Sequence, residues 1–152
     1  MKHIQVVAAI IVYSNDSNDR NSRNNKDSDE ILCMRRGVSR HDYLTGKYEF
    51  PGGKIEPGEE MPQALMRELK EEMDLDVEIK KEDFFMTINH IYPDFEITMH
   101  SFICRVNDKN FTRKEHTEHK WLKAGELGGL DWATADMPIV ERITAGGLEN
   151  WS

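Results

Sequence analysis

The sequence predicts an α/β (α+β) fold, an α/β/α sandwich with a mixed β-sheet between two helices. Short apolar or alternating segments recur along most of the chain, as strands do, and two segments carry helix signals, one before Asp74 and one after Asp136. The 152 residues are 38% hydrophobic, which is enough for one core. We therefore expect residues 1–152 to form a single domain.

The first strand is predicted at Ile4–Tyr13. Lys2 and the apolar run after it could be mistaken for a secretory signal, but the run is β-branched, and neither a basic cluster nor a clear small-residue cleavage site flanks it. No apolar segment has the length of a membrane-spanning helix. The sequence thus favours a cytoplasmic protein that does not act at a membrane.

The segment Ser14–Glu30 contains almost no apolar residue. It cannot bury enough surface to offset the entropy lost on ordering. We therefore expect a mobile loop at residues 14–30, which enlarges the connection to a second strand at Ile31–Arg35. The alternative is that this segment is a functional arm.

The remaining strands are predicted from alternation and turn residues, and a pair of them is antiparallel, turned at Pro93-Asp94. Their ranges are Tyr48–Phe50, Phe84–Tyr92, Glu96–Val106 and His119–Leu122. A final helix should follow Asp136, which can cap it, with Pro138 in its first turn and Gly146 past its end.

The most informative segment, Gly53–Leu75, joins a Gly/Pro-rich turn to a helix that carries Glu68, Glu71 and Glu72. Residues three and four apart share a helix face, so we expect these carboxylates to converge. Their mutual repulsion favours a bound divalent cation, Mg²⁺ with Mn²⁺ as an alternative. The other interpretation is a solvated helix face with Arg67 interleaved.

The turn before this helix favours anions. Glu49–Lys54 and Glu56–Glu59 form two tight bends next to the start of the helix, where backbone N–H groups and the helix dipole attract negative charge. Carboxylates for a metal ion would then lie beside donors for phosphate groups.

These residues resemble the Nudix box, which reads Gly, five residues, Glu, seven residues, Arg-Glu-hydrophobic, one residue, Glu-Glu, one residue, Gly-hydrophobic. The matching positions are Gly53, Glu59, Arg67, Glu68, Leu69, Glu71, Glu72 and Leu75. Only the last glycine departs, because Asp74 replaces it. Asp is among the few residues that adopt the left-handed conformation common just past a helix end, so we expect a slightly strained exit and intact metal chemistry.

Outside the box, the chain resembles MutT-type nucleoside triphosphate pyrophosphohydrolases, and their CTP-directed branch in particular. The segments that carry this likeness are Met34–Arg36, Gly46–Lys54, Glu115-His116 followed by Trp121, Leu130–Ala133 and Ala135–Pro138. The resemblance covers nearly the whole chain except the loop. It implies the Nudix fold and Mg²⁺-dependent hydrolysis of a nucleoside triphosphate to a monophosphate and pyrophosphate.

The resemblance also implies roles for residues. The Gly53 carbonyl would join Glu68, Glu71 and Glu72 at the metal ion. Arg67 would orient Glu59 or a neighbouring carboxylate. The general base remains open, and its candidates are Glu68, Glu115 and Glu118. Arg35 and Lys47 would face phosphates, Asp136 would meet the base, and Glu49 and Phe50 are expected to contact the substrate.

Asp136 bears most on the choice of nucleotide. An ionised Asp only accepts hydrogen bonds, which suits the N4 amine of cytosine and favours CTP, dCTP or 5-methyl-dCTP. In the oxidised-guanine sanitisers of the family an Asn stands there. A protonated Asp136 would also donate and would admit oxidised purines such as 8-oxo-dGTP. A third interpretation is that Asp136 only caps its helix.

Composition restricts the partners. The net charge of −8 argues against a nucleic-acid polymer as partner, because polyanion binding rests on clustered Lys and Arg. We therefore expect the partner to be a small-molecule nucleotide. The protein itself is expected to be a monomer or a homodimer. Cys33 and Cys104 lack metal-type spacing and are expected to be buried thiols. A non-catalytic nucleotide sensor is the alternative of another class, and the intact charged positions of the box favour an enzyme.

Overall fold

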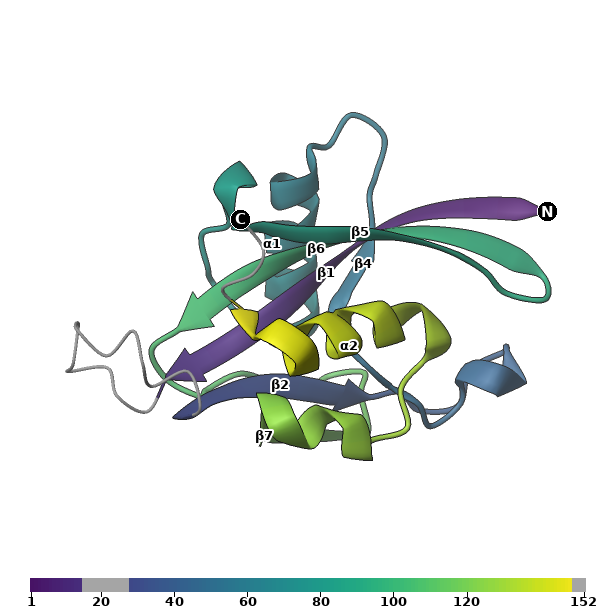
Figure 1. Ribbon diagram of the computed structural model, residues 1–152. Helices are drawn as coiled ribbons and strands as arrows, with labels where there is room; N and C mark the ends of the chain where they lie inside the picture. The colour runs from purple at the N-terminus through teal and green to yellow at the C-terminus, as the bar shows by residue number, and fades with distance from the viewer. Residues whose placement is uncertain (15–27, 149–152) are drawn as a thin grey trace.

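The computed structural model describes residues 1–14 and 28–148, and within them seven strands form one mixed sheet. The strands are β1 (Lys2–Ser14), β2 (Asp29–Arg35), β3 (Tyr48–Glu49), β4 (Gly52–Lys54), β5 (Phe84–Ile91), β6 (Phe95–Val106) and β7 (Glu118–Lys123). The two α-helices among these residues are α1 (Met61–Met73) and α2 (Met137–Gly146), and short 3₁₀ turns lie at Asp42–Leu44, Lys81–Asp83, Ala124–Gly129 and Thr134–Asp136. Figure 1 shows their arrangement.

Strand β1 is the centre of the sheet. It pairs in parallel with β6 from Lys2 to Tyr13 along one edge, and antiparallel with β2 and β4 along the other. Residues 7–12 are all buried, because both faces of the strand are covered. A continuous apolar run of this kind is typical of a strand buried on both faces. The opening segment is therefore a strand, as its β-branched residues predicted, and it lies at the centre of the sheet.

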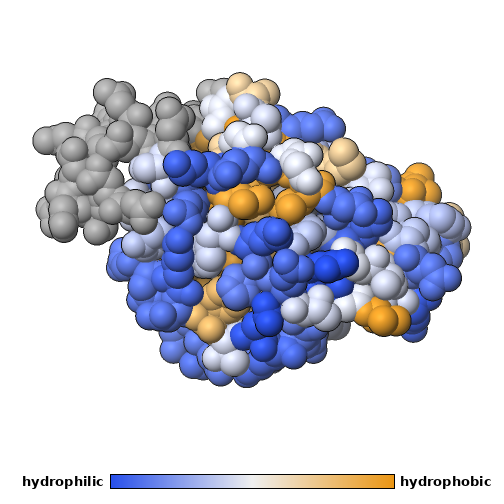
Figure 2. Space-filling model, turned by 90° about the horizontal axis from the view of Figure 1, so that it is seen from below, coloured by the Kyte–Doolittle hydropathy of each residue, from blue (hydrophilic) through white to orange (hydrophobic). Residues whose placement is uncertain are grey.

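The two faces of β1 belong to different cores. Ile10 packs in the core that includes Ile139 of α2, whereas Ile11 packs in the core that includes Leu65 and Leu69 of α1. The helices lie on opposite sides of the sheet (Figure 1), which makes the predicted α/β/α sandwich. The face in Figure 2 is mainly hydrophilic, with small, separated apolar patches.

The predicted bounds of the first two strands were too short. Ser14 pairs with Asp29, so β1 and β2 extend into the segment expected to be a loop. Backbone pairing accepts these polar residues because their side chains find partners, as Asp29 does with Arg105 at 3.5 Å. The rest of the predicted mobile loop, residues 15–27, lies outside the described residues. Strand β4 was not predicted at all, since Gly52-Gly53-Lys54 has no strand propensity of its own.

Helix α1 ends in the left-handed turn that Asp74, the residue after it, suggested. Asp74 has a φ of 51°, and its N–H bonds to the carbonyls of Leu69 and Lys70. The left-handed conformation that a glycine takes at this position of the box is therefore adopted by an Asp.

Both cysteines are free and buried, as predicted. Burial raises the pKa of the Cys33 thiol to about 12 and that of Cys104 to about 11. No helix in the described part of the chain has the length and apolar character needed to span a membrane.

Gly52 is where β4 approaches β1 most closely, because a Cβ atom there would overlap the carbonyl oxygen of Val7. We expect Gly52→Ala to lower the free energy of unfolding by about 3 kcal/mol or more, since rigid backbone must move. Urea denaturation measures this change. Gly125→Ala is the matched control because a Cβ there meets no atom within 4 Å, and equal losses in both variants would contradict the expectation.

Candidate active site

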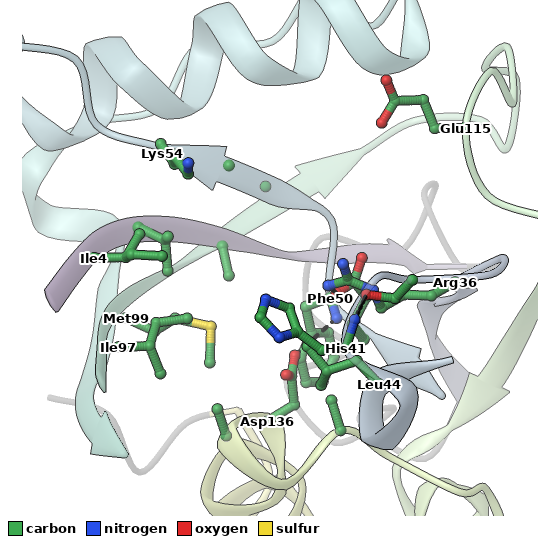
Figure 3. Close-up of a pocket in the computed structure, with 18 of the residues that line it drawn as sticks. Ile4, Arg36, His41, Leu44, Phe50, Lys54, Ile97, Met99, Glu115 and Asp136 are labelled. Carbon is green, nitrogen blue, oxygen red and sulfur yellow. Dashed lines mark hydrogen bonds and ion pairs between the residues drawn. The ribbon is translucent and has the colours of Figure 1, made fainter. Parts of the chain in front are cut away.

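A pocket of about 920 Å³ extends from α1 and β4 to the start of α2 (Figure 3). One part of its lining, which we name the acidic end, consists of Gly53, Glu68, Glu72 and Glu115. Another part, which we name the aromatic end, consists of Phe50, Tyr92, Phe95 and Asp136 together with the apolar Ile97 and Met99. Figure 3 shows Glu115 and Asp136 on opposite sides of the cavity.

At the acidic end, the carboxylate of Glu68 lies directly against the backbone of Gly53. A Cβ atom on residue 53 would overlap the carboxyl group of Glu68, so only glycine permits this approach. Burial raises the pKa of Glu68, while Arg67 opposes the rise and Glu71 and Glu115 add to it. The backbone of Gly53 and the partly buried carboxylate of Glu68 are thus in contact.

Glu72 and Glu115 make the acidic end more crowded. The pKa of Glu72 is raised to about 7, mainly by burial and also by hydrogen bonding to Glu115 and by the negative charges of Glu115 and Glu68. Carboxylates this crowded suit a hard divalent cation, which would offset their repulsion.

Glu71 does not join them, which corrects the expected convergence of three carboxylates on one face. It lies 3.1 Å from Nη1 of Arg67, with 58% of its side chain exposed, and it does not line the pocket. The physical reason is that Arg67 lies one helical turn before Glu71 and attracts it. Within residues 1–14 and 28–148, no three His, Cys, Asp or Glu side chains are already arranged to hold a metal ion.

Arg67 connects the turn to the helix. Its guanidinium donates to both oxygens of Glu59, at 2.7 and 3.0 Å, to the carbonyl of Lys54 at 3.1 Å and to Glu68 at 3.0 Å. The paired bonds to Glu59 are the two-point geometry in which Arg is strongest. Arg67 therefore orients Glu68 and the turn through carboxylates and a backbone carbonyl, and it does not line the pocket.

Glu115 is supplied by residues 107–117, which we name the Glu115 loop. Lys114 Nζ donates to the carbonyl of Glu71 and to Asp74 Oδ1, each at 3.1 Å, and the N–H of Thr112 donates to the carbonyl of Met73 at 2.9 Å. The end of α1 thus anchors the loop that carries Glu115. Asp74 gains a partner that a glycine at this position could not have.

At the aromatic end, Asp136 is buried and accepts a hydrogen bond from the N–H of Phe50 at 3.0 Å. Burial raises the pKa of Asp136 well above its usual range, and the negative charge of Glu49 adds to the rise. Its side chain makes no capping bond to α2. The interpretation of Asp136 as only a helix cap was therefore wrong, because the carboxyl group faces β3 and the pocket instead.

Between the two ends, Glu49 is held from both sides. Arg36 Nη1 donates to its Oε1 at 3.0 Å, and His116 Nε2 lies 2.9 Å from its Oε2. Glu49, Arg36 and His116 all line the pocket. Arg36 brings a cation to the interior of the site.

A model of the NUDIX domain matches residues 24–142 of the chain. The chain belongs to the Nudix family. It is 30% identical over 145 residues to an 8-oxo-dGTP diphosphatase of Escherichia coli (strain K12), which covers 94% of this chain and 98% of that protein. A CTP pyrophosphohydrolase of the same organism is 30% identical over 155 residues and covers 95% of this chain and 94% of that protein.

A solved structure gives the same result. The solution NMR structure of the DNA mismatch repair protein MutT, of the Nudix hydrolase family, from methicillin-resistant Staphylococcus aureus 252 superposes with a TM-score of 0.66 at 35% identity. The match covers 97% of this chain and 100% of that one. The predicted Nudix fold and the likeness to MutT-type hydrolases are confirmed.

The structure brings together some of the predicted site residues of this Nudix hydrolase and separates others. Those that line the pocket are Glu49, Phe50, Gly53, Glu68, Glu72, Glu115 and Asp136. Arg35 instead donates to the Gly46 carbonyl at 3.0 Å and to Glu118 at 3.2 Å, and Lys47 pairs with Asp131 at 2.8 Å. Arg35, Lys47 and Glu118 lie outside the lining. For Arg35 the reason is that neighbouring residues at a strand end point to opposite sides, so Arg36 lines the pocket instead.

Arg36 and His41 line the pocket but are not among the predicted site residues. Arg36 adjoins the predicted Arg35, and the alternation of side chains along β2 could have shown that only one of the two faces the pocket. His41 comes from the irregular loop after β2 and lines the pocket, and no pattern in the sequence marks it.

The burial of Asp136 makes stability depend on pH. Unfolded Asp ionises at about pH 3.9, whereas folded Asp136 keeps its proton to higher pH, so the folded state binds one proton more between the two pKa values. The free energy of unfolding therefore falls there by up to about 1.4 kcal/mol per pH unit. Asp136→Asn removes this dependence and keeps an acceptor for Phe50.

We expect the stability of Asp136→Asn relative to the unmodified protein to increase as the pH rises above about 4. Urea denaturation at a series of pH values measures the difference. A difference that stays constant with pH would show that Asp136 is ionised in the folded protein.

Proposed function

We propose that this Nudix hydrolase cleaves a nucleoside triphosphate to a nucleoside monophosphate and pyrophosphate, with cytosine nucleotides such as CTP, dCTP or 5-methyl-dCTP as substrates in nucleotide-pool housekeeping. The observation that carries this proposal is that one pocket joins a cluster of crowded carboxylates to an aromatic end with a buried carboxyl group. The first suits a metal-bound triphosphate, and the second suits a base. The free, buried thiols are in keeping with a reducing compartment such as the cytoplasm.

The acidic end would hold the cation, Mg²⁺ or alternatively Mn²⁺. Glu68, Glu72 and the Gly53 carbonyl would be its oxygen donors together with Glu115, and Glu71 would have to turn from Arg67 to take part. This all-oxygen set fits a hard divalent ion. When bound, such an ion neutralises charge on the phosphates and lowers the pKa of water.

The protein groups around it have distinct tasks. Arg67 holds Glu68 and Glu59 in place. Arg36 offers a positive charge to phosphate inside the pocket, which Arg35 and Lys47 do not line. Of the three candidates for general base, Glu68 and Glu115 line the pocket, whereas Glu118 is paired with Arg35 outside it. The base that takes the proton from water is therefore one of the former two.

A neutral Asp136 is compatible with cytosine. A protonated carboxyl group both donates and accepts, so it can pair with N3 and the N4 amine of cytosine. It can equally pair with O6 and N1–H of a guanine. The raised pKa of Asp136 and the 8-oxo-dGTP diphosphatase relative therefore support 8-oxo-dGTP as a second candidate substrate. A non-catalytic sensing module is less consistent with intact charged positions in the box.

The metal assignment is tested by Glu72→Gln and Glu71→Gln. We expect each to lower kcat with Mg²⁺ by about 100-fold or more, because one anionic ligand is lost while the shape is kept. Release of pyrophosphate is the measurement, and circular dichroism checks the fold. Glu78→Gln, at an exposed position, is the matched control. Near-normal activity of Glu72→Gln would refute the assignment, and near-normal activity of Glu71→Gln would restrict it to the carboxylates in the pocket.

The substrate is tested with a panel of canonical, 5-methylated and oxidised triphosphates, with release of monophosphate and pyrophosphate as the measurement. We expect turnover of a cytosine nucleotide, because the aromatic end offers a donor and an acceptor that match its amidine edge. A preference for 8-oxo-dGTP over every cytosine nucleotide would transfer the assignment to the second candidate. A preference for ADP-ribose would contradict both.

A further inference from the structure

The loop after β2 closes the aromatic end of the pocket with its own rings. The ring of His41 packs on Phe95 with centroids 4.9 Å apart, and the ring of Tyr43 stacks on Tyr92 at 5.2 Å. Tyr92 and Phe95 are themselves in contact at 5.0 Å. The Tyr92 hydroxyl accepts a hydrogen bond from the N–H of Ala135, next to Asp136, at 2.9 Å. His41 thus belongs to the same wall as the buried carboxyl group.

Asp94, in the turn between β5 and β6, holds His41 in this position. His41 Nδ1 lies 2.9 Å from Asp94 Oδ2, and the hydroxyl of Tyr43 donates to the other oxygen of the same carboxylate. The bond from Tyr43 is the main cause that lowers the pKa of Asp94, so this group is a carboxylate that only accepts. The carboxylate of Asp94 thus joins the loop after β2 to the turn between β5 and β6.

The contact with Asp94 decides which nitrogen of His41 is free. A carboxylate requires a donor, so in the neutral imidazole the hydrogen is on Nδ1 and the lone pair is on Nε2. Figure 3 shows the imidazole of His41 projecting into the cavity, close to Asp136 and facing Ile97 and Met99. Only 20% of the side chain is exposed. An acceptor is therefore presented to an apolar, mostly enclosed part of the pocket.

We infer that His41 is a specificity-determining residue, whose Nε2 accepts an N–H from the nucleobase of the substrate. The inference rests on the proposed function, since it places the base at the aromatic end. A lone pair aimed at the base favours one that presents an amine there, as cytosine and guanine do, and disfavours one that presents a carbonyl, as uracil does. Asp94 is then a positioning residue that fixes the tautomer.

A role in packing alone would be served by the ring without its nitrogens. His41→Phe keeps an aromatic ring against Phe95 and removes both nitrogens, so it separates the two roles. Asp94→Asn keeps the shape of Asp94 and no longer requires a hydrogen on Nδ1. Asp42→Asn removes a carboxylate from an exposed position of the same loop and serves as the control.

The experiment measures kcat and KM for dCTP, dUTP, dGTP and 8-oxo-dGTP with Mg²⁺, together with thermal stability. We expect His41→Phe to lower the ratio of kcat/KM for dCTP to that for dUTP by about tenfold or more, mainly through KM. Asp94→Asn should change the ratio in the same direction by less, and Asp42→Asn should leave it as it is. An unchanged ratio in His41→Phe, whatever its stability, overturns the inference.

Failure of the proposed function gives a different result. If the unmodified protein hydrolyses none of the triphosphates, the proposed function fails, and the inference is then tested by binding alone. Titration of dCMP and dUMP without metal, followed by calorimetry and by the ¹⁵N signals of the imidazole, reports the contact directly. We expect a preference for dCMP and a shift of the Nε2 signal, both absent in His41→Phe. No preference in the unmodified protein would overturn the inference.

Discussion

The approach of Glu68 to the backbone of Gly53 is the contact on which the site depends. The contact requires a residue without a side chain in β4. Strand β4 forms because it can pair with the edge of β1. Helix α1 must then lie across β4, and its apolar face packs on the sheet through Leu65 and Leu69. Gly53, Glu68 and Glu72 are therefore placed by the sheet and the helix packed on it, whereas Glu115 comes from a loop.

Electrostatics around this contact are balanced by cations at its edges. The crowding of Glu68, Glu72 and Glu115 helps to raise the pKa values of Glu68 and Glu72, and Arg67 offsets part of the rise at Glu68. Crowding of this kind is destabilising unless it serves binding, which is why strongly shifted carboxylates cluster at functional sites. At the opposite end, burial and the negative charge of Glu49 raise the pKa of Asp136 well above its usual range, so this carboxyl group has a stronger tendency to keep its proton than an exposed one.

Much of the fold and of the acidic end could be predicted from the sequence, because they depend on local patterns. The β-branched run of β1 and the Nudix box are such patterns. Strand β4 could not be predicted, since its pairing is imposed by β1 on two glycines. The position of Glu71 could not either, because spacing along a helix does not show that Arg67 competes for it. The contact of Asp136 with Phe50 joins residues 86 apart in the sequence.

The anchoring of the Glu115 loop has a consequence for the effect of ionic strength. Its link to α1 is the pair Lys114–Asp74, whose side chains are 41% and 52% exposed. The side chain of Arg67 is only 23% exposed, so its bonds are largely shielded from water. Exposed ion pairs are screened by salt and buried ones much less. Increasing salt therefore loosens the loop that carries Glu115 before it disturbs the helix that carries Glu68 and Glu72, and the two halves of the acidic end respond differently to their medium.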